Sequence, residues 1–310
     1  MKHTIKIATR GSQLALIQSN FVKKWIETHN TQLTVELKII KTTGDKILDS
    51  PLSKVGEKGL FVKEIEESLL DKETDIAVHS MKDVPTVLPQ DLHIIAIGER
   101  EDPRDVLISN SYDSILKLPS GAKIGTSSLR RQVQLLNRLP SLNIVDIRGN
   151  LNTRLNKLES EKLDGIILAA AGVKRMGWES RITEVIPHNV CIPAVGQGAI
   201  GIESRVDNDY VNSIMKMFNH SLTHTCIIAE RSMMRRLEGG CQVPIGGYAY
   251  MENENIMLTA MVASLDGKIM YTNKISGTSS EAENLGIKLA ETLLFMGADK
   301  ILNDIRGLQS

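Results

Sequence analysis

The sequence predicts an α/β protein in which two lobes are joined by two crossovers and followed by a small C-terminal α+β domain. Short apolar segments alternate with helix-like segments over most of the chain, a pattern typical of α/β folds. Two segments interrupt this pattern: EREDPR at 99–104 is highly charged, and CIPAVGQGAIGIE at 191–203 is rich in Pro and Gly. The last ninety or so residues instead contain successive strand-like segments with a hairpin signal.

In the first lobe, strands and helices are expected to alternate around one sheet. The strand-like segments are 4–8, 33–40, 75–79 and 92–98. Ser12 is a candidate helix N-cap before an amphipathic segment, and residues 60–70 have helical spacing. Because helices connect the strands, we expect a mostly parallel sheet.

The second lobe repeats this organisation. Its strand-like segments, at 123–125, 142–147 and 165–168, are each followed by a helix-like segment. The two interruptions set the domain boundaries that we expect. These are 1–98 with 199–217 for the first domain, 99–198 for the second and 218–310 for the third. Two crossings between two lobes form a hinged cleft, and ligand sites favour such interfaces.

The C-terminal segment has a different pattern. A helix is expected at 222–237, ended by Gly239-Gly240, and strands are expected at 243–250, 256–263 and 268–273. Asp266-Gly267 lies between the last two strands and is a strong hairpin signal. A final helix is expected at 279–295, which makes this a small antiparallel α+β domain.

Composition excludes several classes of protein. The 310 residues carry 37 Lys and Arg against 37 Asp and Glu, so no global field attracts nucleic acid. Three scattered cysteines argue against a disulfide framework or a zinc site, and they suit a reducing compartment. The N-terminus lacks a signal-peptide core, and the uncharged run 185–202 contains too many Pro, Gly and polar residues for a membrane helix. We therefore expect a cytoplasmic protein with no metal site and no nucleic-acid or membrane partner.

Residues 121–181 nevertheless form a basic segment, with eleven Lys and Arg against five Asp and Glu. In GTSSLRR, Thr126 and Ser128 place hydroxyls at a helix start, where backbone N–H groups favour an anion. Arg130 and Arg131 follow in the first turn, where they oppose the helix dipole unless an anion compensates them. For this motif alone, the alternative is a capped surface helix with solvated arginines.

Further arginines follow the next strands of this lobe. IRGNLNTRL contributes Arg148 and Arg154, and Arg175 comes after the third strand. Arginines near the carboxyl ends of successive strands point to the ligand crevice of an open α/β sheet, and they bind planar carboxylates bidentately. Phosphate or RNA is the alternative ligand, although Trp178 is the one aromatic residue interleaved here.

AVHSMKDVPT brings Ser80, Lys82 and Asp83 to the end of a first-lobe strand, and Arg10 and Ser12 end another. An Asp that faces a cationic cleft stays ionised. Taken alone, this motif is more simply explained as an exposed Asp–Lys pair in a loop, worth under about 1 kcal/mol. His79 is most simply a packed strand residue.

GGCQVPIG places Cys241 in a glycine loop after a helix, where the thiol is presented rather than packed. A lone cysteine is more often a small buried side chain, and neighbouring cations would have to activate this one. Cys191 and Cys226 lie in apolar runs and are interpreted as packing residues. The residues alone thus predict a polyanion-handling protein with one candidate reactive thiol.

The motifs IKIATRGSQLALIQ, AVHSMKDVPT, EREDPRDVLIS, GTSSLRRQ, IRGNLNTRL, AVGQGAIGIE and LEGGCQVPIG occur here in one order. With them, the chain resembles the hydroxymethylbilane synthase (porphobilinogen deaminase) family over nearly its whole length, most weakly after about Tyr250. The resemblance implies three domains, of which the first two are like periplasmic binding proteins. It also implies a self-made dipyrromethane cofactor, two linked pyrrole rings held by a thioether to Cys241.

The resemblance further implies a transferase of tetrapyrrole (haem) biosynthesis. Such an enzyme joins four porphobilinogen molecules head to tail onto the cofactor with loss of ammonia, and water releases linear hydroxymethylbilane. Asp83 aligns with the family's catalytic carboxylate, which can bond pyrrole N–H groups and stabilise the positive charge that develops. Asp105 and Asp45 are the next candidates for that role.

The positions that we assign to cofactor and substrate binding carry hydroxyl, amide or cationic side chains. They are Arg10, Ser12, Ser80, Lys82, Thr126, Ser128, Arg130, Arg131, Arg148, Arg154, Arg175 and Gln197. Each pyrrole carries an acetate and a propionate, so a growing chain brings many carboxylates that need charge-assisted partners. Gly11 and Met233-Met234 depart from the family pattern without removing a reacting group.

Two rival classes remain. A non-catalytic anion receptor explains the lobes and the arginines but not a loop cysteine, and an RNA-binding protein explains the basic segment but not the overall neutrality. An intact mass above that of the sequence by two pyrroles separates a synthase from both. We expect a monomer whose partner is porphobilinogen.

Overall fold

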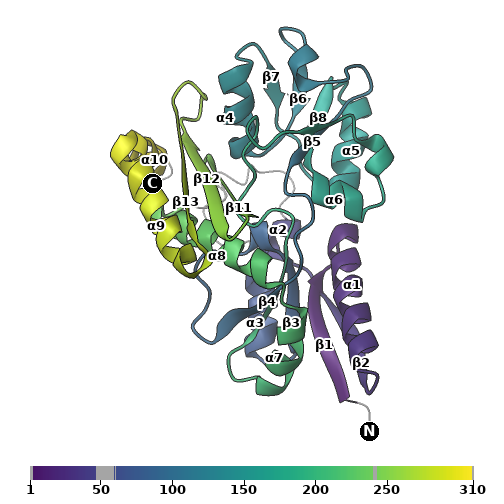
Figure 1. The fold of residues 1–310 in the computed structure, drawn as a ribbon. Helices are drawn as coiled ribbons and strands as arrows, with labels where there is room; N and C mark the ends of the chain where they lie inside the picture. Colours follow the sequence, from purple (N-terminus) through teal and green to yellow (C-terminus); the bar gives the residue numbers. More distant parts are fainter. Residues whose placement is uncertain (1–2, 47–58, 60, 240–242, 309–310) are drawn as a thin grey trace. The chain divides into compact units, whose positions relative to one another are not determined.

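The computed structural model of the chain describes residues 3–46, 59, 61–239 and 243–308 (Figure 1). These residues form two compact units. The first unit holds the described residues up to Glu101 together with Ala199–His224, and the second holds Asp102–Gly198 together with the residues from Thr225 onward. The chain thus passes from the first unit to the second near the charged EREDPR segment and returns within the Pro- and Gly-rich segment.

The first unit is built on a five-stranded sheet. Its strands, in spatial order, are β2 (Leu33–Ile40), β1 (His3–Arg10), β3 (Ile76–Ser80), β10 (Ile200–Arg205) and β4 (Leu92–Ile97). The helices are α1 (Gln13–His29), α2 (Thr43–Lys46), α3 (Lys63–Leu70) and α7 (Asp209–Met215), with 3-10 turns at Met81–Asp83 and Lys216–Phe218. Alternate strand residues face opposite ways, so Ile7 packs with α1 and α7 whereas Ala8 packs with α3.

The second unit contains another five-stranded sheet with the same kind of order. Its strands are β7 (Asn143–Val145), β6 (Lys123–Gly125), β8 (Gly165–Ala169), β5 (Asp105–Ile108) and β9 (Glu184–Ile186). The helices are α4 (Leu129–Arg138), α5 (Leu151–Ser160) and α6 (Ala170–Arg175), with 3-10 turns at Ile115–Lys117 and Glu179–Arg181. Leu135 of α4 is buried on one face of the sheet, and Leu158 of α5 and Val173 of α6 are buried on the other.

The C-terminal part of the second unit is an antiparallel meander covered by helices (Figure 1). Its strands are β11 (Ile245–Glu252), β12 (Asn255–Ala263) and β13 (Met270–Thr278). Its helices are α8 (Ser221–Arg236), which belongs to this unit from Thr225 onward, α9 (Ala282–Leu293) and α10 (Asp299–Gly307), with a π turn at Leu294–Ala298. The predicted hairpin is confirmed: β12 pairs with β13, and Gly267 has the positive φ of +72° that its turn requires. The predicted fold class, two α/β lobes and a small α+β part, is confirmed.

The prediction of mostly parallel sheets was wrong. In each five-stranded sheet two pairings are parallel and two are antiparallel. The cause is the crossovers: β10 enters the first sheet between β3 and β4, β5 enters the second between β8 and β9, and each runs against both neighbours. These two strands, with β9, are also the ones that the alternation of strand and helix did not predict.

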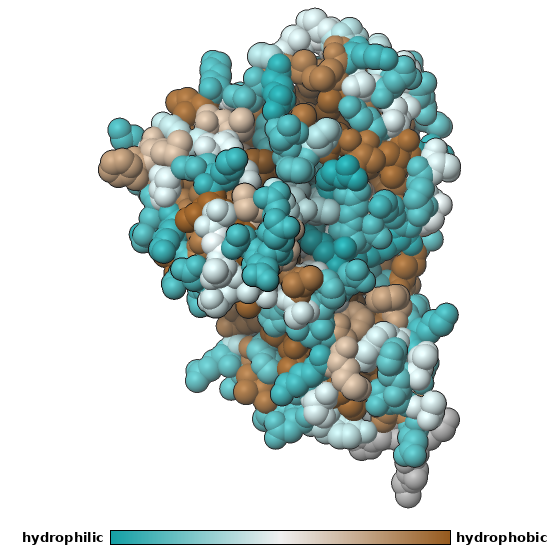
Figure 2. Space-filling view, viewed as in Figure 1, coloured by the Kyte–Doolittle hydropathy of each residue, from teal (hydrophilic) through white to brown (hydrophobic). Residues whose placement is uncertain are grey.

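Apolar and hydrophilic residues are interspersed over the face of the molecule that Figure 2 shows. Among the described residues, no helix is both long enough and apolar enough to span a bilayer. Large exposed apolar side chains such as Val87, Met217 and Phe295 belong to separate elements.

Candidate functional site

A pocket in the first unit lies at the carboxyl ends of two neighbouring parallel strands. Arg10 is the last residue of β1 and Ser80 the last of β3, and these strands pair directly. Both residues line the pocket together with Ser12 and Asp83, so four of the predicted site residues meet there. Lys82 is half-buried in the same turn but is not among the residues that line this pocket.

Arg10 is oriented by protein groups on two sides. Its Nε lies 3.2 Å from Oδ1 of Asp45, and its guanidinium carbon lies 4.2 Å from the centre of the Phe61 ring. Burial raises the pKa of the Asp45 carboxyl, but hydrogen bonds from Arg10 and Thr42 and the Arg10 charge outweigh burial, so the pKa lies below its ordinary value. Asp45 is therefore the hydrogen-bonded counter-ion that orients Arg10.

The hydroxyls of the pocket are also held in place. The predicted N-cap is confirmed, because Ser12 Oγ accepts a hydrogen bond from the Ala15 N–H at 3.3 Å. Gln18, one turn further along α1, donates through Nε2 to Ser80 Oγ at 3.0 Å. Sequence reasoning missed Gln18, because nothing local distinguishes it from a surface glutamine, although it is 3% exposed.

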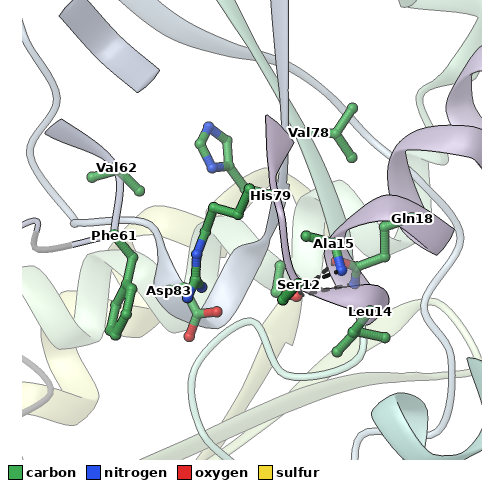
Figure 3. A pocket seen from close by; sticks show the side chains of 11 residues that line it. Ser12, Leu14, Ala15, Gln18, Phe61, Val62, Val78, His79 and Asp83 are labelled. Atoms are coloured by element: carbon green, nitrogen blue, oxygen red, sulfur yellow. Dashed lines mark hydrogen bonds between the residues drawn. The ribbon is translucent and has the colours of Figure 1, made fainter. Parts of the chain in front are cut away.

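Asp83 differs from every other candidate carboxylate in this site. It is half-buried at the end of the 3-10 turn Met81–Asp83, and no described residue hydrogen-bonds to its carboxylate or forms an ion pair with it. Figure 3 shows the Asp83 carboxylate and the Phe61 ring pointing to one side and the His79 ring pointing to the other. The Asp83 carboxylate is thus open to a ligand in the pocket.

His79 is buried in β3, as the sequence analysis predicted for a packing residue. Its Nε2 lies 2.8 Å from Oε2 of Glu203 on the neighbouring strand β10, a partner 124 residues away.

In the second unit, Arg130 and Arg131 converge on one buried carboxylate, that of Asp105. Nη1 of Arg130 lies 2.7 Å from Oδ2, and Nε of Arg131 lies 3.0 Å from Oδ1. Both arginines also donate to backbone carbonyls, Arg130 to Ile192 and Arg131 to Ile167. The anion that the sequence analysis expected beside these helix-start cations is therefore supplied, at least in part, by the protein.

The remaining polar candidates of this unit lie around the same strand ends. Thr126 is buried, and its Oγ1 accepts a hydrogen bond from the Ser128 N–H at 3.2 Å. Gln197 donates through Nε2 to the Pro103 carbonyl at 2.6 Å and to Asp105 Oδ1 at 2.9 Å, so it links the two crossover segments.

Three more arginines follow β7 and β8. Nε of Arg148 lies 3.6 Å from Oδ2 of Asp146, Arg154 donates to the Gly149 carbonyl at 3.0 Å, and Arg175 donates to the Gly198 carbonyl at 2.6 Å. Arg148 lies in the loop after β7, Arg154 lies in α5, and Arg175 ends α6, so these arginines follow β7 and β8, which both neighbour β6 in the sheet.

Of the cysteines, Cys191 and Cys226 are buried, as predicted for packing residues. Burial raises the pKa of the Cys191 thiol to about 12, so it stays neutral. Cys241, the predicted attachment site, lies outside the described residues. No group of three or more His, Cys, Asp or Glu within the described residues is arranged to hold a metal ion.

Two domains of one protein family match this chain. The family described as "Porphobilinogen deaminase, dipyromethane cofactor binding domain" matches residues 5–213, and "Porphobilinogen deaminase, C-terminal domain" matches residues 224–295. The chain belongs to the porphobilinogen deaminase family. The family resemblance carried by the sequence motifs is thereby confirmed.

Curated members of the porphobilinogen deaminase family are similar over nearly the whole chain. The porphobilinogen deaminase of Chlorobium phaeobacteroides is 51% identical over 99% of each chain, and that of Geotalea uraniireducens is 53% identical over 97% of this chain and 95% of its own. Among solved structures, a TRAP periplasmic solute binding protein from Desulfovibrio salexigens aligns with 100% of this chain and 96% of its own, at 9% identity and a TM-score of 0.44.

Proposed function

We propose that this chain is a hydroxymethylbilane synthase in which Asp83 is the catalytic carboxylate and Cys241 carries the cofactor. The reaction joins four porphobilinogen molecules head to tail onto a dipyrromethane primer and releases linear hydroxymethylbilane and ammonia for tetrapyrrole (haem) biosynthesis. The observation that carries the proposal is Asp83: within the described residues its carboxylate has no protein partner, and it lines a pocket built from the family's motifs.

Asp83 acts by electrostatic stabilisation. As ammonia leaves the aminomethyl group of porphobilinogen, positive charge develops on the pyrrole, and a fixed carboxylate beside the ring stabilises that charge. The same carboxylate can accept a hydrogen bond from the pyrrole N–H. Asp45 is less suited to this role because Arg10 and Thr42 already use its oxygens.

The arginines of the second unit fit the cofactor's acidic side chains. Arg130 and Arg131 bring two buried guanidinium groups to the one carboxylate of Asp105, which leaves positive charge for a carboxylate ligand. When bound, the dipyrromethane supplies the primer to which the first substrate pyrrole is joined. The residues that hold cofactor and substrate are Arg10, Ser12, Ser80, Lys82, Thr126, Ser128, Arg130, Arg131, Arg148, Arg154, Arg175 and Gln197.

The test of Asp83 is single-turnover ammonia release from protein that mass spectrometry shows to be loaded with dipyrromethane. Asp83→Asn keeps the size of the side chain and removes its charge, so we expect a loss of about a hundred- to a thousandfold. Asp83→Glu keeps the charge and should retain more activity. The control is Asp91→Asn, an exposed aspartate of the same unit. A loaded Asp83→Asn enzyme within about tenfold of wild type, or about 1.4 kcal/mol, would show that Asp83 is not the main catalytic group.

The intact mass of the wild-type protein tests the function as a whole. A synthase carries a covalent two-pyrrole adduct, whereas an anion receptor or an RNA-binding protein has the mass of its sequence. We also propose that the protein is a monomer and that it is cytoplasmic, the latter because its scattered cysteines suit a reducing compartment. The three-domain division at 98/99, 198/199 and 217/218 stays a prediction.

A further inference from the structure

Asp105 is the first residue of β5, the strand that follows the crossover into the second unit, and its side chain is fully buried. Its two oxygens accept from four side chains. Oδ2 accepts from Arg130 and from the Cys191 thiol at 3.3 Å, and Oδ1 accepts from Arg131 and Gln197. The carboxylate thus lies at the centre of a network that includes both arginines of the GTSSLRR motif.

The charges of this network do not cancel. Arg130 and Arg131 are each about 5% exposed, and Asp105 is the one acidic side chain within the described residues that forms an ion pair with either. Cys191 adds no negative charge because its thiol is neutral. A surplus of one positive charge therefore remains buried, and a buried charge is costly unless it has a counter-ion.

The surplus positive charge is available to a ligand at one edge of the Arg130 guanidinium. Nη1 donates all of the hydrogen bonds of the Arg130 guanidinium, and no described residue accepts from its Nε or Nη2. Arg131 uses Nε, Nη1 and Nη2 for Asp105 and the Ile167 carbonyl. Asp105 thus fixes both guanidinium planes while leaving one edge of Arg130 for a ligand.

The Asp105 carboxyl is ionised beside these two arginines. Burial raises the pKa of this carboxyl, but the charges of Arg130 and Arg131 and the hydrogen bonds to the carboxylate together lower it by more. The pKa therefore lies well below its ordinary value. The cations lie in the first turn of α4, where the helix dipole disfavours them, and the Asp105 charge offsets that cost.

We propose that Asp105 is a positioning residue, an internal counter-ion that holds Arg130 and Arg131 in the geometry that captures a carboxylate of the pyrrole chain. It acts without touching the ligand. The proposal rests on the proposed function, and it places the effect of Asp105 on binding of the acidic side chains rather than on the chemical step.

The experiment uses the full-length protein and measures three quantities: the fraction that carries the dipyrromethane adduct by intact mass, KM for porphobilinogen, and the single-turnover rate of the loaded fraction. For Asp105→Asn we expect adduct content to fall, or KM for porphobilinogen to rise, by about tenfold or more, with the single-turnover rate of loaded enzyme nearly unchanged. Cys191→Ala removes a neutral donor to the same carboxylate, and Asp102→Asn removes another aspartate paired with an arginine, Arg104. Both controls should stay loaded.

If Asp105→Asn does not fold, Asp105→Glu tests the positioning role instead, because it keeps the charge and moves the carboxylate by one methylene. The proposal predicts lower loading or a raised KM for Asp105→Glu, whereas a counter-ion needed only for folding would leave both unchanged. Wild-type loading and KM in whichever variant folds would overturn the proposal. An unloaded wild-type protein would instead overturn the proposed function, so the two failures are distinguishable.

Discussion

At Gly286, α9 packs closely against α8, the helix that precedes the predicted cofactor loop. A Cβ atom on Gly286 would lie 1.9 Å from Ser232 Oγ and 2.3 Å from the Ala229 carbonyl oxygen, both on α8. Ser232 Oγ also joins the two helices, because it hydrogen-bonds to the carbonyls of Ala229 at 3.0 Å and Glu283 at 2.9 Å. Gly286→Ala therefore tests whether this close approach holds the C-terminal part together.

The expected loss follows from three contributions. Overpacking costs about 1–3 kcal/mol, and the backbone oxygen of Ala229 cannot rotate away, so the helices must separate. Separation also weakens the Ser232 bond to Glu283, worth about 1 kcal/mol, while Ala in place of Gly returns up to about 1 kcal/mol of helix propensity. We expect a net destabilisation of about 2 kcal/mol.

The assay compares Gly286→Ala with Gly307→Ala, a matched substitution in α10 whose Cβ would have nothing within 4 Å. Thermal unfolding followed by circular dichroism should show a lower midpoint for Gly286→Ala, by about 2–4 °C per kcal/mol for a unit of this size. Hydrogen exchange should accelerate in α8 and α9. Gly307→Ala should leave the midpoint unchanged or slightly raised. Equal midpoints for the two variants would refute the packing argument.

Three further predictions concern other parts of the chain. Burial, and next the Glu203 charge, raise the pKa of Glu66 to about 7, so the protein loses stability as pH rises from 4.5 through 7. Glu66→Gln should remove this loss. Its free energy of unfolding in urea should exceed that of wild type by about 1–2 kcal/mol at pH 8, with no such gain at pH 4. Gly201→Ala puts a Cβ 2.1 Å from Met81 Sδ, so urea unfolding should show stability lower by about 1–3 kcal/mol. Met81 begins the turn that ends at Asp83, the proposed catalytic carboxylate, so kcat should fall as well. Cys241→Ser should fold without the adduct and without activity; loss of the adduct on changing another cysteine instead would disprove the attachment site.

Much of the fold follows from local pattern. The strand predicted at 33–40 is β2, that at 123–125 is β6, and the Ser12 cap and the Asp266-Gly267 turn are where the sequence places them. These features depend on neighbours a few residues apart, so periodicity, caps and turn residues specify them. The grouping of Arg10 with Ser80 was predictable for the same reason, since carboxyl ends of parallel strands meet at one edge.

The sequence by itself determined which residues carry charge and chemistry, and at which strand ends they lie. Only the tertiary structure decided their partners: Asp105 reaches Arg130 from 25 residues away, and His79 meets Glu203 from 124 away. Both partnerships depend on β5 and β10, which enter their sheets antiparallel to both neighbours. Strand order is set by burial summed over the whole sheet, and no local pattern contains that sum. It also decides which carboxylates have protein partners, and it leaves Asp83, among the described residues, with none.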